Sequence, residues 1–211
     1  MASTKFITFE GGEGSGKTTQ IELLAAALQK SGLEVVTTRE PGGSPEAERL
    51  RKLLFADGIE WDPVAESLLL SAARRDHLLT TVWPAMKDGQ WVLSDRYADS
   101  TLAYQGYGKG VEIAWLESLY QAVAGDFAPD LTLLLDLPVE EGLKRTDARG
   151  VGNNHYERMD PAFHERLRAG YLALAKANPG RIAVIDAAGE AKAIQAEIQR
   201  VVAERLGVHF P

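Results

Sequence analysis

The 211-residue chain has no cysteine, which excludes disulfide bridges and cysteine-based zinc clusters. It also has no apolar run that approaches the ~20 residues needed to cross a bilayer. The first five residues, 1–5, lack the basic and then apolar order of a signal peptide. We therefore expect a soluble, cytoplasmic protein without a membrane partner.

Positive charge is scarce as well, since 23 Lys and Arg face 30 Asp and Glu and leave a net charge of −7. A protein with this balance has little general attraction for nucleic acid, so we expect no such partner. The apolar fraction of 45% and the charged fraction of 25% are ordinary for a globular chain. Together with the length, they predict one domain over residues 1–211.

The strongest positive signal is a glycine-rich segment directly after the apolar run at 6–9. It fills the P-loop pattern G-x-x-x-x-G-K-[ST], in which glycines let backbone N–H groups surround one anion at the start of a helix. We expect Lys17 to reach the β- and γ-phosphates of a nucleotide and the Thr18 hydroxyl to bind Mg²⁺. The pattern predicts a nucleotide site made of Gly11, Gly12, Glu13, Gly14, Ser15, Gly16, Lys17 and Thr18.

Strand and helix patterns alternate along the rest of the chain. Apolar runs that can join the first strand lie at 33–36, 91–95, 131–136 and 182–186. Apolar residues at helical spacing lie between these runs, so we predict an α/β fold with a five-stranded parallel sheet flanked by helices. Asp62 and Pro63 predict the start of a long helix that reaches about Val82, before Pro84 bends or ends it.

The segment at 147–160 breaks this alternation, because it is polar and carries two glycines and two arginines. It is either a solvated surface loop or a short lid that closes over the nucleotide and excludes water. We favour the lid, since a basic flexible segment beyond the fourth strand of a P-loop protein can play this part.

Polar residues follow the predicted strands at the edge where α/β sheets bind ligands. Arg39 and Glu40 follow the second strand, Asp95 and Arg96 end the third, and Glu13 lies within the P-loop. Each residue alone has a plain explanation, such as a helix cap for Asp95 or a surface charge for Arg39. Together they place two arginines and three carboxylates near the γ-phosphate, which indicates an anionic phosphate acceptor rather than water.

Two other P-loop classes fit less well. A GTPase needs the guanine-reading Asn-Lys-x-Asp, which the sequence lacks. A motor or AAA-type ATPase carries several consecutive acidic and apolar residues on its magnesium strand, and the run at 133–136 resembles that strand only faintly. The size of the chain favours a small-molecule phosphotransferase.

The helix predicted after Asp62 carries Leu70 and Arg74 on one face. Arg74 and Arg75 could be a solvated pair on the surface. In the alternative, Leu70 covers the flat side of an acceptor base and Arg74 hydrogen-bonds to its edge. Spacing alone leaves both explanations open.

Five segments together resemble the bacterial thymidylate kinases, a family of P-loop nucleoside monophosphate kinases. They are the P-loop at 9–18, Thr-Arg-Glu-Pro-Gly-Gly at 38–43, Asp-Arg-Tyr at 95–97, Tyr-Gln-Gly at 104–106 and Gly-Asp-Phe-x-Pro-Asp at 125–130. The resemblance extends from Lys5 to about Ile198. It implies a homodimeric enzyme of dTTP synthesis that transfers the γ-phosphoryl group of ATP to dTMP, giving dTDP and ADP, with Mg²⁺.

The resemblance also implies roles for single residues. Arg39 and Arg96 would hold the acceptor phosphate, Glu13 would face the 3′-hydroxyl, and Tyr104 would crowd the 2′ position. The implied dTMP site consists of Glu13, Arg39, Pro41, Leu70, Arg74, Arg96, Ser100, Thr101, Tyr104 and Gln105. Thr19, Arg145 and Arg149 would join the P-loop in binding ATP, and Asp95 would position the Mg²⁺ shell. Catalysis would depend on Lys17, Asp95, Arg96, Arg149 and Arg158.

Two positions depart from the family pattern. Leu70 stands where the family usually stacks a phenylalanine on thymine, and His155 stands where the lid usually carries a catalytic arginine. The positive charge of the lid then falls to Arg149, Arg158 or a protonated His155. Leu70 motivates the alternative of a related kinase with another acceptor. His155 motivates that of a nucleotide-binding regulator with little or no catalysis.

Overall fold

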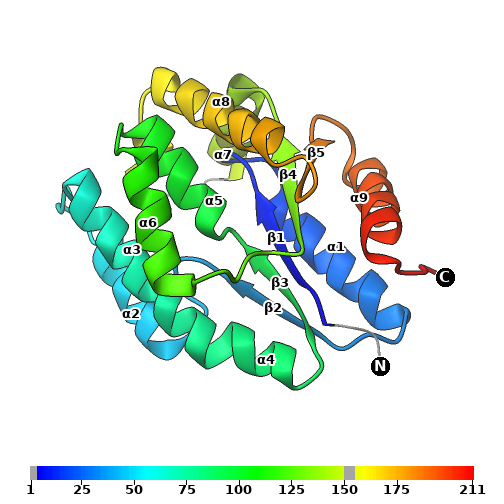
Figure 1. Ribbon diagram of the computed structural model, residues 1–211. Coiled ribbons are helices and arrows are strands. Elements are labelled where there is room, and N and C mark those ends of the chain that lie inside the picture. Colours follow the sequence, from blue (N-terminus) through cyan, green and yellow to red (C-terminus); the bar gives the residue numbers. More distant parts are fainter. Residues whose placement is uncertain (1–3, 150–154) are drawn as a thin grey trace.

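The computed structural model describes residues 4–149 and 155–211, without the side chains of Arg149, His155 and Glu157. Its centre is a parallel sheet of five strands in the order β2-β3-β1-β4-β5 (Figure 1). The strands are β1 (Phe6–Glu10), β2 (Val35–Arg39), β3 (Trp91–Asp95), β4 (Leu131–Asp136) and β5 (Ile182–Asp186). This arrangement confirms the predicted α/β class. The chain leaves β1 toward one side of the sheet and later crosses to the other, so ligands are expected beyond the end of β1.

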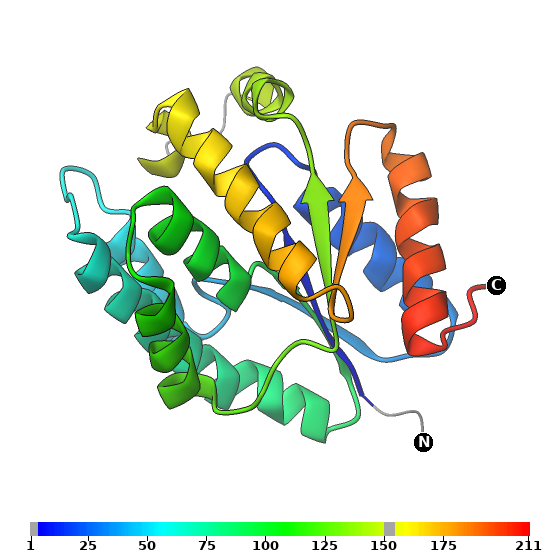
Figure 2. The ribbon, with the colours of Figure 1, turned by 45° about the horizontal axis from the view of Figure 1, so that its top comes forward.

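Helices cover both faces of the sheet (Figures 1 and 2). On one face, α1 (Lys17–Lys30) and α9 (Ala191–Leu206) bury their apolar sides in a shared core with the strands. Over the opposite face and along the rim lie α2 (Pro45–Leu54), α3 (Pro63–His77), the π-helical η1 (Leu78–Val82), α4 (Trp83–Lys87), α5 (Ala98–Thr101), the π-helical η2 (Leu102–Gly108), α6 (Ile113–Ala124), α7 (Val139–Arg149), the 3₁₀ turn η3 (His155–Arg158) and α8 (Pro161–Ala177). In the described ranges, none of these helices is both long and apolar enough to span a membrane.

One predicted boundary is wrong, and at Pro84 one of the two predicted outcomes, the end of the helix, is excluded. The second strand begins at Val35 rather than Leu33, because the N–H of Leu33 donates to the carbonyl of Leu28 and closes the end of α1. The long helix also continues past Pro84 to Lys87. The wider π-helical turn η1 precedes Pro84, which takes the second position of α4, where a backbone N–H is not needed.

Candidate active site

The P-loop connects β1 to α1 at the carboxyl end of the sheet. Gly14 has a φ of 71°, and a Cβ at this position would lie 2.1 Å from the carbonyl oxygen of Gly142. A larger residue would therefore push the loop away from α7. No described side chain caps α1 at Gly16. The first N–H groups of α1 thus point at the space enclosed by the loop, which suits an anion.

The Lys17 ammonium group folds back over the loop. It donates to the carbonyl oxygens of Gly11 at 3.1 Å and Gly12 at 2.9 Å. Burial, together with the charge of Arg96, lowers the pKa of Lys17 to about 8. A bound phosphate would supply the negative charge that a buried lysine needs to stay protonated.

Thr18 and Asp95 meet beside the loop. The Thr18 hydroxyl donates to a carboxylate oxygen of Asp95 at 3.3 Å. The described residues contain no cluster of three or more His, Asp or Glu that could hold a metal by themselves. At phosphate sites, however, Mg²⁺ takes one or two protein ligands and fills its shell with water and phosphate oxygens. The Thr18 and Asp95 oxygens fit that requirement.

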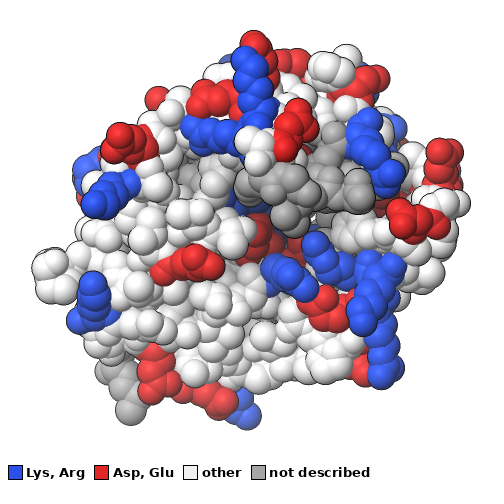
Figure 3. Space-filling model, turned by 180° about the vertical axis from the view of Figure 1, so that it is seen from behind, with Lys and Arg blue, Asp and Glu red and all other residues white. Residues whose placement is uncertain are grey.

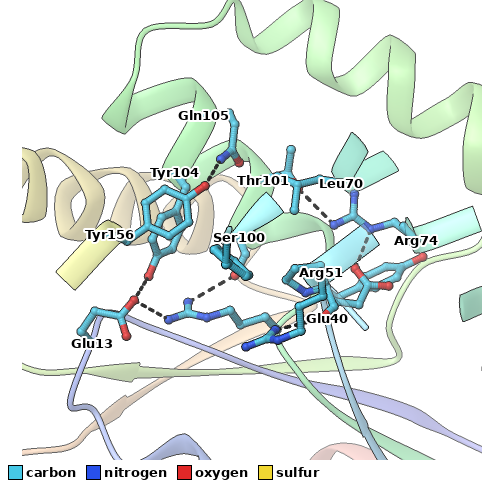
Figure 4. Close-up of a pocket in the computed structure, with 14 residues that line it drawn as sticks. Glu13, Glu40, Arg51, Leu70, Arg74, Ser100, Thr101, Tyr104, Gln105 and Tyr156 are labelled. Atoms are coloured by element: carbon cyan, nitrogen blue, oxygen red, sulfur yellow. Dashed lines mark hydrogen bonds and ion pairs between the residues drawn. The ribbon is translucent and has the colours of Figure 1, made fainter. Parts of the chain in front are cut away.

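An open cavity of about 550 Å³ adjoins the loop (Figure 4). It is lined by Glu13, Glu40, Pro41, Arg51, Phe55, Leu70, Arg74, Arg96, Tyr97, Ser100, Thr101, Tyr104, Gln105 and Tyr156. The structure thus brings together every residue of the implied dTMP site except Arg39.

Arg96 stands between the P-loop and this cavity. Its φ of 68° is unusual for a residue other than glycine. Its guanidinium group donates to the Gly11 carbonyl oxygen at 2.9 Å and to the Glu13 carboxylate at 3.1 Å. The Glu13 carboxylate also accepts from the Tyr104 hydroxyl at 2.7 Å. Burial raises the pKa of Glu13, but the charges of Arg96 and Lys17 outweigh it and the net shift is downward.

Arg74 is not a solvated residue, so the surface-pair explanation is wrong for it. Its side chain is only 4% exposed. Nε donates to Glu40 at 2.8 Å and Nη2 donates to Thr101 at 3.0 Å. The guanidinium carbon also lies 5.1 Å from the centre of the Tyr97 ring. These contacts hold the guanidinium group at the wall of the cavity, and its contact with a base stays a prediction.

Arg39 does not line the cavity. Its side chain is 54% exposed, and it donates to both carboxylate oxygens of Glu48 at 3.0 Å. Arg51, from α2, lines the cavity instead and donates to the Pro41 carbonyl oxygen at 2.7 Å. Arg51 was missed because the sequence does not indicate which face of α2 turns toward the site. Its place next to Leu50, within an apolar helical pattern, was the available signal.

Glu10, the last residue of β1, is a second residue that was missed. It is fully buried and accepts from the backbone N–H of Tyr97 at 2.7 Å, from the Ser100 hydroxyl at 2.5 Å and from the Tyr171 hydroxyl at 3.1 Å. Burial, with the charge of Asp99, raises the pKa of Glu10 to about 7. The carboxyl group ties β1 to α5 and α8 directly behind the P-loop. A carboxylate inside an apolar strand was the signal in the sequence.

The expected ATP contacts outside the loop are only partly described. Thr19 is exposed on the first turn of α1. Arg145 donates to the Ala187 carbonyl oxygen at 3.1 Å, between α7 and the segment after β5.

The predicted lid at 147–160 lies only partly within the described residues. Residues 150–154 and the side chains of Arg149 and His155 lie outside them. Its first residues, up to Arg149, continue α7 rather than forming a loop. Arg158 is exposed, and its guanidinium group lies 3.9 Å from the Asp57 carboxylate.

Charge on the surface is mixed. Figure 3 shows positive and negative side chains side by side around a hollow on the face opposite to the view of Figure 1. The cavity lining also carries charges of both signs. It contains Arg51, Arg74 and Arg96 together with Glu13 and Glu40. This favours a ligand that combines an anionic group with neutral polar groups.

Comparison with known proteins agrees with this geometry. The family model described as thymidylate kinase matches residues 9–198. A thymidylate kinase of Caulobacter vibrioides is 52% identical over 209 residues, which cover 99% of this chain and 100% of the relative. One of Magnetococcus marinus is 46% identical over 207 residues, or 98% of this chain and 99% of the relative.

A solved structure agrees as well. The crystal structure of thymidylate kinase from Ehrlichia chaffeensis superposes with a TM-score of 0.77 at 36% identity, and covers 95% of this chain and 99% of that one. Because the matches extend over nearly the whole length and include both the P-loop and the adjoining cavity, the chain belongs to the thymidylate kinase family.

Proposed function

We propose that this protein transfers the γ-phosphoryl group of ATP to dTMP, giving dTDP and ADP. The observation that carries the proposal is the pairing of a P-loop with a separate cavity, joined at Arg96. A P-loop alone is compatible with many nucleotide-dependent activities. The adjoining cavity, lined by arginines and buried tyrosines, makes an acceptor nucleotide the best match.

The residues on the P-loop side bind and align the donor. The loop N–H groups and Lys17 hold the phosphates of ATP, and Thr18 with Asp95 would hold Mg²⁺, partly through water. When bound, Mg²⁺ neutralises charge on the phosphate oxygens. Phosphoryl transfer needs little covalent chemistry from the protein, so alignment and fixed positive charge account for most of the catalysis.

The residues of the cavity bind the acceptor. Arg96 and Arg51 are the cations available to its phosphate, and their contacts with Glu13 and Pro41 fix their positions before binding. Because Arg96 also contacts the P-loop, its charge lies where the donor and acceptor phosphates meet. Positive charge that is fixed in advance at such a point stabilises the transition state without reorganisation.

The remaining parts of the cavity suit the nucleoside. Glu13 and Tyr104 are placed for the sugar, and Arg74, Thr101 and Gln105 for the edge of the base. We further propose that residues 1–211 act as one domain, that 147–160 form a lid with Arg149 and Arg158 as its cations, and that the protein works in the cytosol.

We also propose a homodimer. Val64 and Leu68 lie one turn apart on α3, Leu79 lies on η1, and the three side chains are 42%, 49% and 51% exposed. A second copy of the chain would cover these apolar side chains.

The function is tested by turnover with ATP over a panel of nucleoside monophosphates. We expect dTMP to give the highest kcat/KM, and the Lys17→Ala variant to lose at least ~10³ in turnover while it stays folded. Preference for another monophosphate would assign the protein to a different acceptor, as Leu70 first suggested. Complete absence of turnover with every acceptor would support a regulator instead.

A further inference from the structure

A buried polar cluster joins three elements beside the acceptor cavity. Glu66 comes from the first turn of α3, Gln105 from η2, Lys109 from the position directly after η2 and Tyr156 from η3. Glu66 is 3% exposed and Gln105 is 1% exposed. Gln105 and Tyr156 line the cavity, whereas Glu66 lies behind them.

The hydrogen bonds of the cluster depend on one another. The Gln105 amide nitrogen lies 3.0 Å from Oε2 of Glu66 and 2.8 Å from the Tyr156 hydroxyl oxygen. The Tyr156 hydroxyl donates to Oε1 of Glu66 at 2.7 Å. Lys109 donates to Oε2 of Glu66 at 2.8 Å and thereby balances the buried negative charge.

These contacts allow only one orientation of the Gln105 amide group. An ionised carboxylate can only accept, so the amide atom next to Glu66 must be the NH₂ group. The Tyr156 hydroxyl has a single proton, which it donates to Glu66, so its oxygen accepts the second amide hydrogen. A flipped amide would place its carbonyl oxygen against the Glu66 carboxylate oxygen and the Tyr156 hydroxyl oxygen, and both amide contacts of the cluster would be lost.

The consequence is that Gln105 can offer the ligand only a carbonyl oxygen. Both of its N–H groups are used within the cluster, and Figure 4 shows its oxygen on the side away from the Tyr156 hydroxyl. Arg74, on another wall of the cavity, is a pure donor. Its hydrogen bonds to Glu40 and Thr101 use two of its five N–H groups.

We propose that Glu66 is a positioning residue that sets base selectivity by fixing the amide orientation of Gln105. A donor from Arg74 and an acceptor from Gln105 match a pyrimidine that has a carbonyl oxygen at C4 and an N–H at N3. Cytosine presents the reverse, an amino group at C4 and an unprotonated N3. Glu66 therefore selects the thymine type of edge without touching the base. This inference rests on the proposed dTMP kinase function.

The test compares kcat/KM for dTMP, dUMP and dCMP at saturating ATP. Glu66→Met fills the same space but removes both acceptors, so the Gln105 amide becomes free to turn. We expect the ratio of dTMP to dCMP to fall at least about tenfold. The ratio of dTMP to dUMP should stay unchanged, because uracil presents the same carbonyl and N–H pattern.

Two variants serve as controls. Glu66→Gln keeps an acceptor for the Gln105 amide and should retain most of the selectivity. Lys109→Met removes the neighbouring charge but leaves Glu66 in contact with Gln105, so its ratio should also stay near that of the wild type. If Glu66→Met does not fold, the double variant Glu66→Met/Lys109→Met removes the buried lysine charge together with the carboxylate and gives the same readout.

The outcomes distinguish a failure of the inference on Glu66 from a failure of the proposed dTMP kinase function. If Glu66→Met lowers kcat/KM for dTMP and dCMP by the same factor, Glu66 is merely structural and the inference is overturned. The inference is also overturned if Glu66→Met changes the ratio equally in a Gln105→Met background, since Glu66 would then not act through Gln105. Failure of the wild-type protein to use dTMP at all would instead refute the proposed function.

Discussion

Single residues at this site are held in place before any ligand binds. Lys17 contacts the loop carbonyl groups, Arg96 contacts Glu13, and Arg74 contacts Glu40. Such contacts fix side chains that would otherwise lose conformational freedom on binding. They also shift pKa values, because burial and neighbouring charges act on the same groups.

Lys17 gives a prediction for pH. Its pKa of about 8 in the free protein must rise when phosphates bind, because they favour the protonated form. Below pH 8 the lysine is already protonated, so it contributes no pH dependence to the affinity for ATP. Above pH 8, binding must take up a proton, so the Kd for ATP should rise by up to about tenfold per pH unit. Calorimetric titration from pH 7 to 9.5 checks this, with Lys17→Ala, which should lack the effect, as the control.

A flat affinity for ATP across that range would mean that Lys17 does not titrate there. The same titrations in buffers of different ionisation enthalpy would report the proton uptake directly.

Arg51 and Arg39 provide a second prediction. Arg51 lines the acceptor cavity, whereas Arg39 is exposed and paired with Glu48. Arg51→Ala should raise the KM for dTMP about tenfold, the scale of a lost hydrogen bond to a charged group. Arg39→Ala should change it less than about threefold, because exposed ion pairs contribute little. Steady-state kinetics with both nucleotides varied would decide, and the opposite ranking would restore the role that the family resemblance gives to Arg39.

At the scale of elements, the acceptor cavity depends on the close packing of η2 against α8. η2 carries Tyr104 and Gln105, and its last residue, Gly108, lies against Phe163 of α8. A Cβ on Gly108 would lie 2.5 Å from a ring carbon of Phe163, which is itself buried. The π-helical geometry of η2 widens the turn that presents both side chains to the cavity, as is frequent at functional sites.

Gly108→Ala should therefore push η2 away from α8. We expect a loss of about 1–3 kcal/mol in the free energy of unfolding, typical of overpacking in a rigid core. The KM for dTMP should rise, while the Kd for ATP stays near the wild-type value, because the P-loop lies on other elements. Urea denaturation and steady-state kinetics measure the two effects. Gly180→Ala is the control, since a Cβ there meets no atom within 4 Å. An equal loss in the free energy of unfolding in both variants would disprove the packing argument.

At the scale of the whole molecule, the apolar face of α3 and η1 lies directly behind residues of the site. Leu68 is 49% exposed, and Leu70, two residues further along α3, lines the acceptor cavity. A second copy of the chain on this face would bury the exposed side chains and stabilise the helix that carries Leu70 and Arg74.

If α3 forms the dimer interface, Leu68→Glu should produce a monomer. Like charges would face each other across the two-fold axis, and a buried unpaired carboxylate is costly. Sedimentation velocity of the wild-type protein and the Leu68→Glu variant at equal concentration measures the change in oligomeric state. Leu53→Glu, at an exposed position of α2, is a matched control. A wild-type protein that sediments as a monomer would refute the dimer itself.

Local patterns in the sequence were sufficient for the P-loop, the α/β class and the family. The glycines and Lys17 lie within one short segment, and the strands are apolar runs, so each signal is contained in neighbouring residues. Local patterns did not determine where the strand after Gly32 begins or how the helix continues at Pro84, because backbone hydrogen bonds beyond each segment decide these limits.

Only the tertiary structure decided which charged residues face the acceptor. Arg51 rather than Arg39 lines the cavity because α2 turns one face toward Pro41. Glu10 and Glu66 are buried next to partners more than 30 residues away in the chain, such as Tyr97 and Gln105. Whether a buried carboxylate is tolerated depends on donors that folding brings to it, and a linear sequence does not specify those neighbours.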